Sequence, residues 1–179
     1  MPAYLKKKDN IDKDCENNKS CDCKNNEKCE KCYKPTPKPL LLFCGQGGMA
    51  QFSSPDDPPV NIGSVTVDTR NLCSPIVKIK FSSTVNLSGI DTAPEALLTF
   101  RLFRVCDGGV ALALNSWVYE VFQINNISEP LTLNTSFGFI FCDCSKAPRL
   151  CDYFVEVSID NLVNATVDVS DIQIQALAQ

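Results

Sequence analysis

Ile76-Val-Lys-Ile-Lys-Phe81 is the stretch that decides the fold, because its apolar and charged side chains alternate. Val77, Ile79 and Phe81 fall on one side of an extended chain, and two lysines fall on the other. This period of two predicts a strand with one face in a core and the other face in water.

Similar short apolar or alternating segments lie on both sides of this stretch, and turn residues separate them. Asp107-Gly-Gly109 predicts a hairpin turn. The apolar parity changes at Ser170-Asp171, which predicts a β-bulge in the last strand. The further strand candidates are residues 40–44, 64–69, 85–87, 96–106, 110–114, 117–124, 131–133, 136–142, 153–159 and 166–176.

No helix of normal length is expected from this pattern. The sequence therefore predicts an all-β fold, a single jelly-roll or β-sandwich domain of about eight to ten antiparallel strands. We expect this domain to occupy residues 40–179.

Two segments of different composition precede the predicted domain. Residues 1–33 are rich in Lys, Asn, Asp, Glu and Cys, too polar to build a core, and are expected to form a flexible connector arm. Residues 34–39, Lys-Pro-Thr-Pro-Lys-Pro, favour polyproline II and predict a semi-rigid spacer. Residues 1–39 hold ten Lys against seven acidic residues, whereas the rest holds seven Lys and Arg against fourteen acidic residues.

Composition argues against several classes of function. The chain has no histidine, so the commonest general base and all His-containing metal sites are absent, and we expect no enzyme and no cofactor. Asp56, Asp57 and Asp143 are interpreted as solvated loop or turn acids without an acid–base partner. The mixed charge of the arm argues against nucleic acid, and no apolar run is long enough for a membrane span or a classical signal peptide.

The eleven cysteines carry the chemistry of the chain. An odd number leaves at least one of them unpaired or bonded to another molecule. Cys142 and Cys144 share one face of a strand at a spacing better suited to two separate partners than to each other. Cys21 and Cys23 repeat this spacing in the arm, so we expect bonds between copies of the chain. The arm holds Cys15, Cys21, Cys23, Cys29 and Cys32, and the predicted domain holds Cys44, Cys73, Cys106, Cys142, Cys144 and Cys151.

Other interpretations of the same residues stay open. All disulfides could be internal and simply stabilise the domain. Zinc could bind to four arm thiolates, Cys21, Cys23, Cys29 and Cys32, in a coat protein that stores metal, although no apolar residues surround them. A binding module for glycan or protein, tethered by the arm, would need an aromatic groove. The candidate cluster is Trp117, Tyr119 and Phe122, which an alternating strand explains more simply as core residues.

Several motifs together resemble a cysteine-rich family of uncharacterised function from anaerobic spore-formers. They are Leu41-Leu-Phe-Cys-Gly-Gln-Gly-Gly48, Asp68-Thr-Arg-Asn-Leu-Cys-Ser-Pro75, Phe103-Arg-Val-Cys106 and Phe141-Cys-Asp-Cys144, together with the Cys-containing arm and the proline spacer. In architecture the chain also resembles the endospore appendage subunits, jelly-roll proteins whose N-terminal connector forms disulfides with other subunits of a pilus-like fibre.

The resemblance implies a self-assembling, disulfide-crosslinked fibre on the spore surface, with the protein itself as its main partner and other spore-surface proteins as further partners. It also implies release by lysis of the mother cell, which needs no signal peptide. By position, the five arm cysteines would be the donors and Cys44 and Cys142 or Cys144 the acceptors. Cys73, Cys106 and Cys151 are kept as further candidate acceptors.

Overall fold

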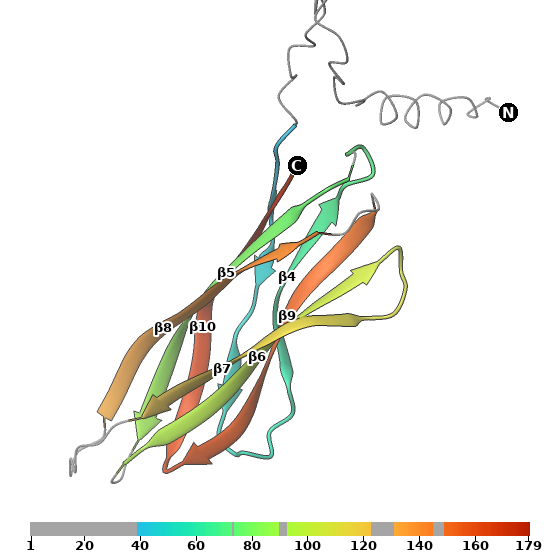
Figure 1. Cartoon of the computed structure of the whole chain (residues 1–179). Helices are drawn as coiled ribbons and strands as arrows, with labels where there is room; N and C mark the ends of the chain where they lie inside the picture. Colours follow the sequence, from blue (N-terminus) through green and yellow to red (C-terminus); the bar gives the residue numbers. More distant parts are fainter. Residues whose placement is uncertain (1–38, 73, 90–92, 123–130, 145–148) are drawn as a thin grey trace, which may run out of the picture. The chain divides into compact units, whose positions relative to one another are not determined.

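The computed structural model describes residues 39–72, 74–89, 93–122, 131–144 and 149–179 (Figure 1). Residues 40–179 form one compact unit. Ten strands make up the regular structure of the described residues, and they form two antiparallel sheets. No helix in this part of the chain is long and apolar enough to cross a membrane. The all-β prediction is therefore confirmed.

Sheet A and sheet B contain five strands each. Sheet A has the strand order β1-β10-β5-β8, with the short β3 also paired to β10, and sheet B has the order β2-β4-β9-β6-β7. The strands of sheet A are β1 (Leu41–Cys44), β3 (Ala50–Phe52), β5 (Val77–Gly89), β8 (Leu131–Asp143) and β10 (Ala165–Ala178). Those of sheet B are β2 (Gln46–Gly47), β4 (Val60–Asp68), β6 (Glu95–Cys106), β7 (Leu112–Phe122) and β9 (Leu150–Val163).

The pairings are nested along the chain, which is the jelly-roll arrangement. β6 pairs with β7, β5 with β8, β4 with β9, and β1 and β3 with β10. Two further pairings, β10 with β5 and β9 with β6, join these hairpin-like pairs into the two sheets. Figure 1 shows the first and last strands side by side, because Leu41 is opposite Ala178.

Alternating side chains fill the space between the two sheets, as the period of two predicts. Val77, Ile79 and Phe81 of β5 are buried, and the two lysines between them are exposed. Aromatic rings extend this core. Phe100 of sheet B stacks on Phe137 of sheet A with 4.1 Å between ring centroids, and Phe81 stacks on Phe139 at 5.1 Å.

Two predicted irregularities are confirmed. In the hairpin between β6 and β7, Asp107 and Gly108 both have positive φ, and the Gly109 N–H donates to the Cys106 carbonyl at 2.9 Å. The pairing of β10 with β5 shifts register after Ser170, where Asp171 has a φ of 51°. This β-bulge lets both halves of β10 place apolar side chains in the same core.

Strand lengths differ from the sequence prediction. The candidates 76–81 and 85–87 merge into one strand, β5, which begins at Val77, and two further pairs of candidates merge into β7 and β8. Near the start, the chain leaves sheet A after Cys44 and joins sheet B as β2. Gly45 makes this crossing possible, because a Cβ there would lie 2.3 Å from the Ser64 carbonyl oxygen.

Candidate functional site

Three of the cysteines that the structure describes are free, and all three are exposed: Cys44, Cys142 and Cys144. Cys44 and Cys142 lie on two edge strands of sheet A, β1 and β8. On β1, Leu41 and Phe43 are half-buried, so the alternate residue Cys44 points away from the core. Cys142 lies opposite Lys78 in the second-last pair of the β5–β8 ladder, and Cys144 follows the end of β8.

The register sets the separation of Cys44 from the other two thiols. Residues that are paired in three successive ladders lead from Cys44 across β10 and β5 to Ile140, which is two residues from Cys142. Three strand spacings and two residues place the Cα atoms of Cys44 and Cys142 about 16 Å apart. A disulfide requires Cα atoms within about 7 Å of each other, so these two thiols cannot bond within one subunit.

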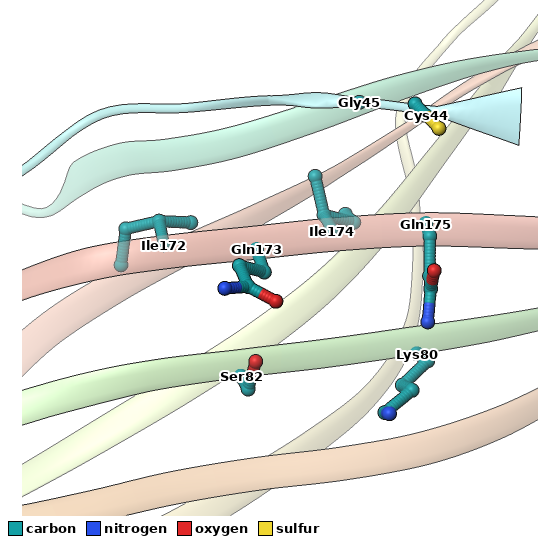
Figure 2. A pocket seen from close by; sticks show the side chains of 8 residues that line it. All are labelled: Cys44, Gly45, Lys80, Ser82, Ile172, Gln173, Ile174 and Gln175. Carbon is teal, nitrogen blue, oxygen red and sulfur yellow. The ribbon is translucent and has the colours of Figure 1, made fainter.

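Cys44 lies at a shallow hollow of about 230 Å³ on sheet A (Figure 2). The hollow forms where β1 leaves β10 for sheet B, next to the β-bulge at Asp171. Polar side chains from β5 and β10 line much of it, so an incoming polar segment would find hydrogen-bonding groups beside the thiol. The lining residues are Cys44, Gly45, Lys80, Ser82, Ile172, Gln173, Ile174 and Gln175.

Cys106 and Cys151 differ from the exposed thiols, because they form a disulfide with each other. They are directly opposite one another on β6 and β9 of sheet B, with 4.0 Å between Cα atoms. The sequence kept both as further candidate acceptors for an arm. The structure instead pairs them within one chain, where they cross-link the ends of two neighbouring strands.

Asp143, between the exposed Cys142 and Cys144, is not the solvated turn acid that the sequence predicted. It is 8% exposed and faces the space between the sheets. Its Oδ2 accepts hydrogen bonds from Arg104 Nη1 at 2.5 Å and from the Tyr153 hydroxyl at 2.7 Å. The sequence prediction failed here because the two partners lie on β6 and β9, strands of the other sheet, which local alternation does not bring to Asp143.

This cluster is a polar connection between the sheets. Burial and the hydrogen bond to Asp143 raise the pKa of the Tyr153 phenol. Burial alone lowers the pKa of Arg104, but the hydrogen bond and the charge of Asp143 outweigh it, and the net shift is upward. The phenol and the guanidinium therefore stay protonated, and each donates to the same carboxylate oxygen.

The other singled-out residues do not form a site. Asp57 accepts from the backbone N–H groups of Ser53 and Ser54, which stabilise its charge and lower its pKa. Trp117 faces the core and stacks on Phe139 with 3.8 Å between centroids. Tyr119 packs on Phe137, and Phe122 is exposed, so the three aromatic residues of β7 do not line a common groove.

Several predicted cysteines lie outside the described residues. These are Cys73 and the arm cysteines Cys15, Cys21, Cys23, Cys29 and Cys32. The zinc interpretation of the arm therefore stays a prediction. Among the described residues, no group of three or more Cys, Asp or Glu side chains is arranged to hold a metal ion.

The fold and the cysteines define the class to which the molecule belongs: an all-β protein whose jelly-roll body exposes free thiols on one of its sheets. The chain belongs to the family described as "Domain of unknown function (DUF4489)", whose model matches residues 38–179. No curated protein sequence matches the chain.

Some solved structures are similar to part of this chain. The structure of infectious bursal disease virus Gx strain has 9% identity and a TM-score of 0.37, and the match covers 79% of this chain but 32% of the viral chain. Eiger TNF from S. frugiperda has 13% identity and a TM-score of 0.35, with 79% and 93% covered. The CBM22-1 xylan-binding domain of Paenibacillus barcinonensis Xyn10C has 13% identity and a TM-score of 0.28, with 76% and 94% covered. Similarity at this level carries no functional argument.

Proposed function

We propose that the protein is a structural subunit of a self-assembling, disulfide-crosslinked filament or appendage outside the cell, on the spore surface. Its arm cysteines bond to exposed thiols on the bodies of neighbouring copies. The observation that carries this proposal is the set of exposed thiols on sheet A: Cys44 lies about 16 Å from Cys142, too far for a bond within one subunit.

The length of the arm supports bonding between copies. The twelve residues from Cys32 to Cys44 span up to about 40 Å when extended. A compact body of this size is roughly 30–40 Å across, so the arm reaches a neighbouring body. An arm that docks onto an identical body makes a head-to-tail contact, and such contacts propagate as filaments when they do not close into rings.

Two edge strands support noncovalent stacking of the bodies. β7 and β8 are the last strands of their sheets, and they run for 11 and 13 residues. Each strand contains one acidic residue, no lysine, no arginine and no proline. Long edge strands without lysine, arginine or proline are open to strand addition, and here the added strand would come from another copy.

The disulfide bonds in this proposal fit a structural role outside the cell. Disulfides persist in oxidising surroundings, and the spore surface meets this requirement after the mother cell lyses. The proposal includes no catalytic activity and no nucleic-acid or membrane partner. Other spore-surface proteins with accessible thiols are additional partners.

The test is oxidation of the full-length chain at a series of concentrations, followed by a non-reducing gel and electron microscopy. We expect a ladder of multimers and fibres, both reduced in amount by a thiol reductant. Replacing Cys21 and Cys23 with serine should weaken the ladder and leave the melting temperature unchanged. Oxidised protein that runs as a monomer at every concentration would refute the proposal, and about one zinc ion per chain would favour the metal-binding interpretation instead.

A further inference from the structure

We propose that Asp143 is the positioning residue of the body's thiol pair: it holds Cys142 and Cys144 in separate outward positions and prevents a disulfide between them. The role of this arrangement in assembly rests on the proposed function, because two separate thiols can each form a disulfide with another chain. The chemical claim concerns one chain, and it is tested there.

The first step of the argument is the anchoring of Asp143. Its carboxylate comes from sheet A, and both of its partners, Arg104 and Tyr153, come from sheet B. All three side chains are largely buried, and Arg104 and Tyr153 are opposite each other on neighbouring strands. Turning Asp143 outward would leave the guanidinium and the phenol without this acceptor, which is costly for buried groups.

The second step is strand geometry. Successive side chains of an extended strand point to opposite faces, so an inward residue at 143 places both neighbouring thiols outward. Their Cβ atoms are then about 6.5–7 Å apart. A disulfide requires about 3.5–4.5 Å between Cβ atoms, so Cys142 and Cys144 can bond only if the backbone bends between them.

The third step is the position of this segment in β8. The ladder with β5 ends at the pair Val77 and Asp143, so Cys144 lies beyond the last paired residue. Strand ends open more easily than strand centres. The anchor of Asp143 therefore adds to the last ladder pair in keeping the backbone extended at this strand end.

The chemistry that is prevented is a simple exchange. With glutathione disulfide as the oxidant, Cys142 and Cys144 would lose two protons and two electrons and form one S–S bond, and the oxidant would be reduced to two glutathione thiols. In the anchored geometry this exchange stops at a mixed disulfide with one of the two thiols. The other thiol of the pair is too far away to displace the glutathione.

The experiment measures the equilibrium between the Cys142–Cys144 bond and the free thiols in a glutathione redox buffer. It uses the full-length chain with serine at the five arm cysteines, and peptide mass spectrometry after alkylation as the readout. We expect little of this bond in the parent chain. Asp143→Ser should raise its equilibrium constant at least tenfold, because serine releases the anchor.

A second variant acts from the opposite sheet. Arg104→Gln leaves the thiol segment unchanged, removes the charged partner, and should shift the same equilibrium in the same direction. This variant decides the question if Asp143→Ser does not fold.

Two controls separate positioning from stability. Glu156→Gln removes the carboxylate that lies 3.6 Å from Arg101 on the same sheet as Arg104, and Leu98→Ala truncates a fully buried side chain six residues from Arg104 along β6. Neither should change the Cys142–Cys144 equilibrium. Equal equilibrium constants in the parent chain and both anchor variants would overturn the inference, as would a parent chain in which the bond forms readily. Because the readout is a bond within one chain, it is independent of whether oxidised chains form a ladder.

Discussion

Replacing both Cys106 and Cys151 with alanine should lower the free energy of unfolding of the body by about 4 kcal/mol. The two residues are separated by 45 positions in the sequence. For a closed loop of that length, the lost chain entropy of the unfolded state corresponds to about 4 kcal/mol at 25 °C. Alanine is the suitable replacement because Cys151 is buried and a serine hydroxyl there would add a desolvation cost of its own.

The assay is guanidinium unfolding followed by the fluorescence of Trp117, the one tryptophan of the chain, which stacks on Phe139. With a slope of roughly 4 kcal/mol per molar, the midpoint should fall by about 1 M. The double variant should still form the multimer ladder, because neither thiol belongs to the exposed set. A loss of stability below about 1 kcal/mol would refute the argument that this bond restrains the unfolded chain.

Two further predictions concern the buried cluster and an edge strand. The folded body holds the phenolic proton of Tyr153 more tightly than the unfolded chain does, so the stability that this adds is complete below about pH 10 and falls as the pH rises further. Tyr153→Phe should therefore flatten the decline of the melting temperature above about pH 10, and an unchanged slope would contradict the assignment. Val118→Lys places a charge on an exposed position of β7. It should weaken association in the presence of reductant, measured by sedimentation, and shift the free energy of unfolding by no more than about 0.5 kcal/mol, whereas undiminished association would argue against stacking through this edge.

The parts of the fold that could be predicted from the sequence are those that alternation decides locally. The pattern from Ile76 to Phe81 and the parity change at Ser170-Asp171 each describe a single strand, and the structure confirms both. The two-residue and three-residue strands β2 and β3 were missed, because segments that short have no period. Their pairing depends on the crossing at Gly45, which is a property of two sheets rather than of one segment.

The candidate site was predictable to a similar extent. That Cys142 and Cys144 share one face of a strand followed from their spacing, and the same spacing implies that Asp143 faces the opposite way. That signal was present in the sequence, but its meaning depends on Arg104, 39 residues away, and on Tyr153 in another strand. The bond between Cys106 and Cys151 likewise requires knowing that β6 and β9 are neighbours.

The internal disulfide and the exposed thiols are connected through this cluster. Arg104 and Tyr153 are opposite each other on β6 and β9, and Cys106 and Cys151 form the facing pair two residues further along the same strands. The disulfide therefore holds together the two strand ends that carry both partners of Asp143. Separating those ends would move the two donors apart, and one carboxylate oxygen could then no longer accept from both. In the proposed arrangement, the disulfide inside sheet B thus helps to fix the direction of the Cys142 and Cys144 thiols on the opposite sheet.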